Sequence, residues 1–211
     1  MNKILILYPA LFQVRSKFQR KLGRILSRQT ECELVYPEDA HGFIAELQTP
    51  ALLHKVLETN WQTYGISHAV IFDDGEEFSA ETQWLQAQNI PIRHIHIKLT
   101  RVINIDKEDA RAYGQAYHYI GRQSQRANGE PNWSNPYSMY DYQSDGDQEA
   151  LSRDTVIHKF SYDFERDLLP TQLKKQDVLQ LAGKRLGCHC KPLACHGDIL
   201  ADYVNAWDDG L

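Results

Sequence analysis

The sequence predicts an α/β fold: a Rossmann-like parallel sheet followed by a smaller α+β C-terminal unit. In the first part of the chain, short apolar runs alternate with segments of helical periodicity, as expected for parallel strands joined by crossover helices. The composition then changes, and residues 121–147 are rich in Gly, Asn, Ser, Pro, Gln and Tyr. We therefore expect one unit over residues 1–104 and a second over residues 105–211, with no flexible linker between them.

Each element of the first unit has its own signal. Continuous apolar runs are typical of strands buried on both faces of a parallel sheet, and they indicate strands at residues 3–8, 33–36 and 68–72. Residues 90–97 are expected to form a fourth strand with one wetter face, because Ile95 and Ile97 alternate with His94 and His96. Apolar residues at helical spacing predict the connecting helices, which we place at residues 14–27, 43–58 and 79–88. Ser79 is the expected N-cap of the last of these helices.

The second unit is expected to contain helices and one further strand. Helical patterns cover residues 151–169, 177–181 and 197–207, and the strand covers residues 184–188. Between them, residues 123–148 form a long stretch with little periodicity but several aromatic side chains. A loop of this length in a compact protein is usually functional, so we expect an ordered loop that forms the rim or lid of a site.

Charge and hydropathy exclude some classes of function. A formal net charge of -5 gives no global basic field for bulk binding of nucleic acid. The basic residues between Arg15 and Arg28 are interpreted as the solvated face of a helix, with a phosphate-binding face as the alternative. The first apolar run, Ile4 to Leu7, is too short for a signal peptide or a membrane span. We expect a cytoplasmic protein with reduced thiols and no membrane partner.

The strongest chemical signal is a cysteine cluster near the C-terminus. Three of the four cysteines, Cys188, Cys190 and Cys195, fall within eight positions, followed by His196 and Asp198. One interpretation is a catalytic or ligand-binding pocket in which Cys195, His196 and Asp198 react at the start of the last helix. A second is a metal site formed by Cys188, Cys190, Cys195 and His196, with zinc as the candidate cofactor. Plain packing of buried thiols is the third.

Three separated motifs resemble a known family. Tyr119-Ile120-Gly121-Arg122, Trp133-Ser134-Asn135-Pro136 and the cysteine-rich segment 186–200 occur in this order. Together they resemble domain of unknown function 4326, which occurs in phages and bacteria and has no settled activity. The resemblance covers about residues 117–206. It implies that one site contains Gly121, Arg122, Asn135, Pro136, Cys188, Cys190, Cys195, His196 and Asp198.

The N-terminal half resembles a second family. Residues 69–75, the segment Ser79-x-Glu81-Thr82 and residues 87–92 are similar to a strand-turn-helix-strand of the SLOG and nucleoside deoxyribosyltransferase superfamily. This resemblance implies a Rossmann-like fold and proteins that bind nucleotides or cleave N-glycosidic bonds with a carboxylate. However, Tyr8-Pro9-Ala10-Leu11-Phe12 stands where a glycine-rich phosphate loop is expected. We interpret the acidic segment 73–81 as a polar turn. The alternatives are a separate vestigial site, which the missing phosphate loop favours, and a second wall of the C-terminal pocket.

Two functional hypotheses follow. In the first, an enzyme of the hydrolase or transferase type acts on N-glycosidic bonds of a small nucleotide- or nucleoside-like ligand. Arg122 then holds an anion together with the last helix, unless it pairs with an aspartate of the loop, and Asn135 orients the ligand. In the second, a metal-bearing module binds a protein or nucleic acid without catalysis. Both place one concave pocket among Gly121, Arg122, Asn135, Cys188, Cys195, His196 and Asp198.

Overall fold

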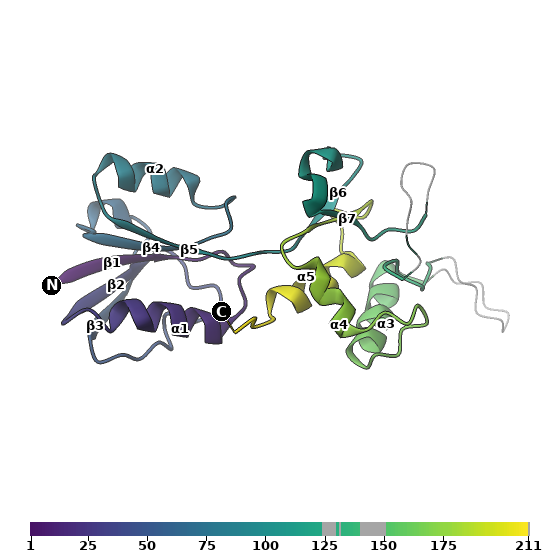
Figure 1. The fold of residues 1–211 in the computed structure, drawn as a ribbon, viewed down its shortest axis with the longest axis horizontal. Coiled ribbons are helices and arrows are strands. Elements are labelled where there is room, and N and C mark those ends of the chain that lie inside the picture. Colours follow the sequence, from purple (N-terminus) through teal and green to yellow (C-terminus); the bar gives the residue numbers. More distant parts are fainter. Residues whose placement is uncertain (124–129, 131, 140–150, 211) are drawn as a thin grey trace. The chain divides into compact units, whose positions relative to one another are not determined.

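The computed structural model describes residues 1–123, 130, 132–139 and 151–210 (Figure 1). The chain forms two compact units, one of Met1–Lys98 with Ala206–Leu211 and one of Leu99–Asn205. The division differs from the expected boundary after residue 104 at two places. Residues 101–104 belong to the second unit because they form a strand of its sheet. The C-terminal tail belongs to the first unit, where the guanidinium of Arg20 pairs with Asp208.

The first unit is built on a five-stranded sheet in which every pairing is parallel. Its strand order is β3-β2-β1-β4-β5, the arrangement of a Rossmann-like fold, and the predicted fold class is confirmed. The strands are β1 (Asn2–Leu7), β2 (Cys32–Tyr36), β3 (Leu52–Leu57), β4 (His68–Asp73) and β5 (Ile92–His96). The inner strands are almost fully buried, which explains their continuous apolar runs.

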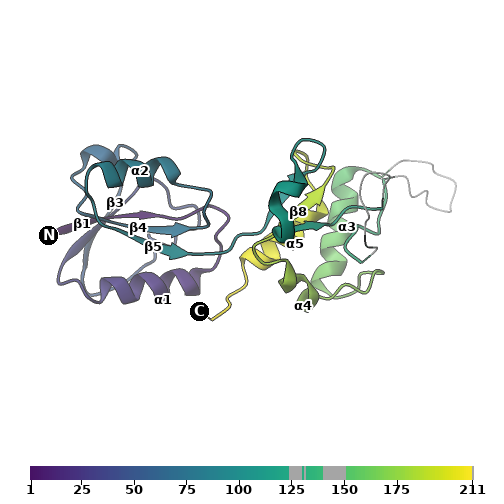
Figure 2. The same cartoon turned by 45° about the horizontal axis from the view of Figure 1, so that its top comes forward.

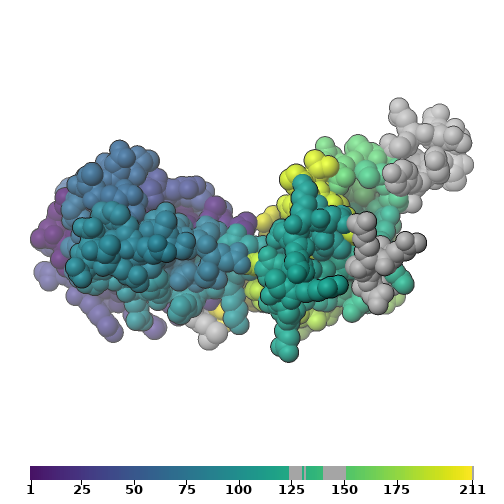
Figure 3. Space-filling model, turned by 90° about the horizontal axis from the view of Figure 1, so that it is seen from above, coloured from purple at the N-terminus to yellow at the C-terminus, as the bar shows by residue number. Residues whose placement is uncertain are grey.

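Helices cover both faces of this sheet. Helix α1 (Arg15–Leu26) and helix α2 (Ser79–Ala87) lie on opposite sides of it in Figures 1 and 2. The space-filling view from above shows the blue and teal residues of the α2 side (Figure 3). A short 3-10 helix, η1 (Trp61–Thr63), adds the buried Trp61 to the core under α2. There Trp61 packs edge-on against Trp84, with 5.1 Å between the ring centroids.

Two expectations for the first unit are wrong. Residues 43–58 do not form a helix, because the chain turns before Pro50 and then enters β3. Proline cannot continue a helix, and the residues after it pair with β2. Ser79 is not the N-cap of α2 either. It is the first helical residue, and Phe78 precedes it with a left-handed φ of 61°.

The second unit contains a three-stranded parallel sheet in the order β6-β8-β7. The strands are β6 (Arg101–Asn104), β7 (Tyr117–Tyr119) and β8 (Arg185–Cys188), and only β8 was expected. The helices are η2 (Ala110–Ala116), α3 (Arg153–Glu165), α4 (Lys175–Val178), η3 (Leu179–Leu181) and α5 (His196–Asn205). Apolar side chains from β8, α3 and α5 form one core, which includes Phe160, Leu186 and Leu200. The sheet is smaller than that of the first unit, although the two units have similar lengths.

Part of the predicted loop lies outside the described residues. Of residues 123–148, the structure describes 123, 130 and 132–139, so the predicted rim or lid cannot be placed as a whole. Trp133 is described and buried in the core of the second unit. Across the ranges that the structure describes, no helix is both long and apolar enough to cross a membrane.

Candidate functional site

One pocket lies at the carboxyl ends of two of the three parallel strands in the second unit, β7 and β8. Asn104 ends β6, Tyr119 ends β7 and Cys188 ends β8, and the N-terminus of α5 follows the loop after β8. The pocket has a volume of about 310 Å³. Ligands of open parallel sheets bind beyond the carboxyl ends of the strands. The second unit therefore presents the edge where such a site is expected.

The pocket brings together most of the residues that the sequence singled out. The predicted residues in its wall are Gly121, Arg122, Asn135, Cys188, Cys190, Cys195 and His196. Asp198 is not among the lining residues. The wall also contains residues that the sequence reasoning missed, namely Tyr119, Tyr137, Arg153 and His189. Gly121 is required there because an added Cβ would lie 2.6 Å from the ring of Tyr119.

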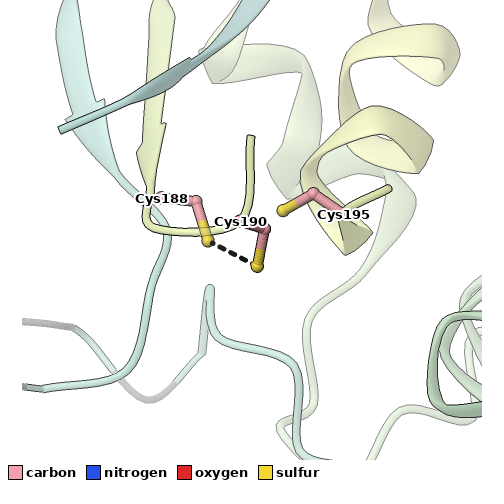
Figure 4. A group of neighbouring side chains, drawn as sticks. All are labelled: Cys188, Cys190 and Cys195. Atoms are coloured by element: carbon pink, nitrogen blue, oxygen red, sulfur yellow. Dashed lines mark hydrogen bonds between the residues drawn. The ribbon is translucent and has the colours of Figure 1, made fainter. Parts of the chain in front are cut away.

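The three cysteines converge at the pocket. Cys188 lies at the end of β8, Cys190 follows in the loop, and Cys195 directly precedes α5 (Figure 4). The Sγ atoms of Cys188 and Cys190 are 3.5 Å apart, and all three Sγ atoms lie within 4.8 Å of one another. This group contains three of the four predicted ligands and does not include His196, and metal binding itself stays a prediction. Cys188 and Cys195 are buried, and Cys190 is half-buried.

Hydrogen bonds within the cluster favour one thiolate. The pKa of Cys190 is lowered by hydrogen bonds from the thiol of Cys188, from that of Cys195 and from Arg153. The same contacts with the other two sulfurs raise the pKa of Cys195 well above its usual range. Cys190 is therefore the thiol of the cluster whose thiolate form is favoured, and the guanidinium of Arg153 contributes to this. The cluster is chemically distinct from three independent, buried thiols.

His196 connects three segments of the second unit. Its Nε2 atom lies 3.1 Å from the carbonyl oxygens of both Ile120 and Trp133, so Nε2 carries a proton and donates to them. Its Nδ1 atom lies 3.6 Å from the Sγ atom of Cys195. Burial lowers the pKa of His196 and keeps the ring neutral. This placement favours a positioning role, whereas the sequence suggested a catalytic one.

Arg122 and Asn135 form the wall from the β7 side. The Arg122 guanidinium donates to the carbonyl oxygen of Asn135 at 3.1 Å and to that of Tyr137 at 2.6 Å. The Asn135 side chain accepts a hydrogen bond from the backbone N–H of Tyr137 at 2.9 Å. The Arg122 guanidinium therefore binds backbone carbonyl groups of the wall. The ligand contacts expected of both residues stay predictions.

Asp198 caps the last helix. Its carboxylate accepts a hydrogen bond from the backbone N–H of Cys195 at 2.9 Å and pairs with the Lys191 ammonium at 2.5 Å. A carboxylate in the first turn is also favourable for the helix dipole. These contacts fix the geometry around Cys195 and leave Asp198 behind the pocket wall. These contacts give Asp198 a structural role, and the reactive role expected from the sequence stays a prediction.

Residues at the end of β6 complete the site. The Asp106 carboxylate lies 2.7 Å from Nδ1 of His189. Asn104 donates its amide to the carbonyl oxygens of His189, at 3.3 Å, and Lys191, which fixes the loop that carries Cys190. A signal for this contribution exists in the sequence, where the apolar pair Val102-Ile103 is followed by Asn104 and then Asp106. Such a pattern marks the end of a short strand.

The corresponding edge of the first unit is filled by side chains. The hydroxyl of Tyr8, directly after β1, donates to the Asp39 carboxylate at 2.5 Å. Asp39 also accepts from the backbone N–H groups of Ile44 and Ala45. Phe12 stacks on Phe72 with 5.2 Å between the ring centroids. Where a Rossmann-like nucleotide site needs glycines and open backbone N–H groups, this chain has buried aromatic rings.

The acidic turn after β4 also uses its carboxylates locally. Asp73 accepts a hydrogen bond from Gly75 N–H at 2.8 Å and lies 3.0 Å from Nδ1 of His94. Asp74 accepts from the backbone N–H groups of Glu76 and Glu77 at 3.2 and 3.3 Å. These contacts support the interpretation of this segment as a polar turn.

The two units thus define a class of protein: a Rossmann-like unit followed by a small α/β unit with a cysteine-lined pocket. Comparison with known families assigns both parts. Residues 1–103 match the minimal SLOG domain, and residues 103–206 match domain of unknown function 4326. Both resemblances are confirmed. SLOG domains are associated with nucleotide-related binding and catalysis, and the second domain has no assigned function.

One curated relative comes from a phage. The chain is 45% identical over 58 residues to an uncharacterized 12.4 kDa protein in the nrdA-td intergenic region of Enterobacteria phage T4. The match covers 28% of this chain and 54% of the phage protein, about half its length. No solved structure matches the chain.

Proposed function

We propose that the second unit binds a small ligand of the nucleotide or nucleoside type, with an anionic nucleotide favoured, in the pocket beyond β7 and β8. The charge of the pocket wall carries this proposal. Among the described residues that line the pocket, two are arginines, Arg122 and Arg153, and none has a carboxylate, while the neutral ring of His196 adds no charge. The whole chain has a formal net charge of -5, so the charge of this wall is opposite in sign to that of the chain. A basic, partly enclosed surface favours anions because the surrounding protein screens charge less than water does.

The remaining wall suits the organic part of such a ligand. Tyr119 and Tyr137 contribute aromatic rings, and Val156 and Ile157 of α3 contribute apolar surface. The volume of about 310 Å³ is at the lower end of the range for small-molecule sites. This size favours a nucleoside or mononucleotide over a dinucleotide. The confirmed SLOG domain in the same chain supports this ligand class.

The chemistry we propose uses His189 as the acid–base group. Asp106 orients its imidazole through Nδ1, which is how a carboxylate positions a histidine for proton transfer. A carboxylate nucleophile could cleave an N-glycosidic bond, but the described part of the wall contains no carboxylate. In the hydrolytic form of the proposal, water attacks the anomeric carbon and His189 accepts its proton. The C–N bond breaks, and the base departs with the bonding electrons and takes up a proton from His189 or from solvent. Binding without turnover is the simpler form of the same proposal.

Ligand binding is tested by isothermal titration calorimetry with nucleosides, mononucleotides and ribose phosphate on the full chain. Arg153→Gln removes one cation of the wall, and Arg24→Ala removes an exposed cation of α1 in the other unit as the matched control. Charge-assisted hydrogen bonds contribute about 1.5–3 kcal/mol, so we expect roughly 10- to 100-fold weaker binding for Arg153→Gln and no change for Arg24→Ala. The proposal is wrong if no compound binds, or if both variants bind as the wild type does.

A further inference from the structure

We propose that Cys188, Cys190 and Cys195 bind a single zinc ion whose fourth coordination position opens into the pocket. This inference goes beyond the proposed function, because metal binding requires only the three thiolates and no organic ligand. It starts from the distances between the sulfur atoms.

The sulfur atoms have the spacing of a mononuclear site. In tetrahedral zinc coordination a Zn–S bond of about 2.3 Å places neighbouring sulfurs about 3.8 Å apart. Here Cys188 and Cys190 are 3.5 Å apart at Sγ, and no pair in the group exceeds 4.8 Å. Small rotations of the side chains are enough to place all three sulfurs on one ion. A [4Fe–4S] cluster binds each cysteine at a different iron atom and holds the sulfurs farther apart.

The surroundings of the cluster prepare it for a cation. The backbone N–H of Gly197 donates to Sγ of Cys195 at 3.4 Å, and this sulfur lies at the N-terminus of α5, where the helix dipole favours negative charge. Asn104 fixes the carbonyl groups on both sides of Cys190. Three thiolates and Zn²⁺ leave one negative charge, and Arg153 beside Cys190 offsets it. Such supporting contacts around the ligands are typical of built metal sites.

The fourth position is not taken by the residue that the sequence suggested. His196 is outside the group of converging donors, and its Nε2 atom donates to two backbone carbonyls. Asp198 is engaged with Cys195 N–H and Lys191. All three cysteines line the pocket, so the free vertex faces the cavity. Water or a donor atom of the bound ligand completes the tetrahedron, as in zinc sites that take part in catalysis.

Metal content is the first test. The full chain is purified with a non-thiol reductant and without chelator, and zinc, iron and copper are measured by mass spectrometry. We expect one zinc per chain, and loss of at least about tenfold in zinc affinity for Cys190→Ser, since each thiolate contributes to the ion's coordination. Cys190 is the least buried of the three, so this variant is the one expected to fold. Cys32→Ala, in β2 of the other unit, is the control and keeps its zinc.

Cobalt substitution tests the open vertex. Co²⁺ added to metal-free protein should give thiolate charge-transfer bands and the intense visible bands of tetrahedral coordination, and azide or imidazole should shift the visible bands. Bands that do not respond contradict the open position. Iron or copper at stoichiometric level, or four titratable thiols with no bound metal after zinc addition, overturns the zinc site. A zinc-loaded protein that binds no nucleoside or nucleotide leaves this inference intact and refutes only the proposed function.

Discussion

Replacement of His196 tests whether this residue positions the site. His196→Ala removes the donor shared by the carbonyl oxygens of Ile120 and Trp133, which belong to buried residues. Leaving a buried acceptor unpaired costs about 1–3 kcal/mol. The ring also packs edge-on against Phe160 at 5.2 Å, and its loss creates a cavity that adds about 2 kcal/mol or more. The expected loss is therefore about 3–5 kcal/mol, a large part of the 5–15 kcal/mol that typically stabilises a domain.

His196→Gln is the matched variant because its side-chain amide can donate from about the same place as Nε2. We expect it to lose about 1–2 kcal/mol, since one hydrogen bond is kept with less favourable geometry. The assay is urea unfolding combined with hydrogen–deuterium exchange of the full chain, read at residues 117–121 and at α5, which report on the second unit alone. Equal stability of His196→Ala and the wild type would refute this reasoning. Equal loss in both variants would show that packing, and not the hydrogen bonds, is responsible.

Three further predictions concern the same unit. Asp198→Ala should lower stability by about 0.5–2 kcal/mol through loss of the helix cap, as measured by urea unfolding. Gly187→Ala should cost about 1–3 kcal/mol, because the added Cβ would lie 2.6 Å from the ring of Tyr117 on the paired strand, and thermal unfolding should show this loss. Burial lowers the pKa of His196 in the folded state, so its neutral form contributes full stability above about pH 6.5. As the pH falls below that value the unfolded chain takes up the proton first, and stability should decline by up to about 1 kcal/mol per pH unit, with a smaller decline in His196→Gln measured by urea titrations at several pH values.

The sequence predicts the buried centre of the first unit well and the edge strand β3 poorly. Strands β1, β2 and β4 are covered on both faces and read as uninterrupted apolar runs. Strand β3 lies at the edge of the sheet, and its exposed His54 and partly exposed Lys55 interrupt the apolar pattern. Periodicity alone does not separate such a segment from a helix. Strands β6 and β7 are four and three residues long, too short to show any period.

The candidate site can likewise be predicted from the sequence only in part. The three cysteines are close in sequence, and their convergence follows from a strand end, a short loop and a helix start. The role of His196 depends instead on carbonyl groups 76 and 63 positions away, which no local pattern reveals. The pairing of His189 with Asp106 has the same origin, because it requires β6 and β8 to be neighbours. The sequence therefore indicates which residue types can form the site. The direction in which each side chain points follows only from the fold.

A comparison of the two sheets explains why the candidate site lies in the second unit. Both sheets are parallel, so both have a carboxyl edge at which ligands can bind. At the first edge, the Tyr8 hydroxyl contacts Asp39 and the His41 ring contacts the carbonyl oxygen of Ala10, so these polar groups are satisfied within the protein. At the second edge, three thiols and Arg153 border a cavity. Polar and ionisable groups that border open volume remain available for a metal or a ligand, whereas groups bound to one another across a packed edge contribute mainly to stability.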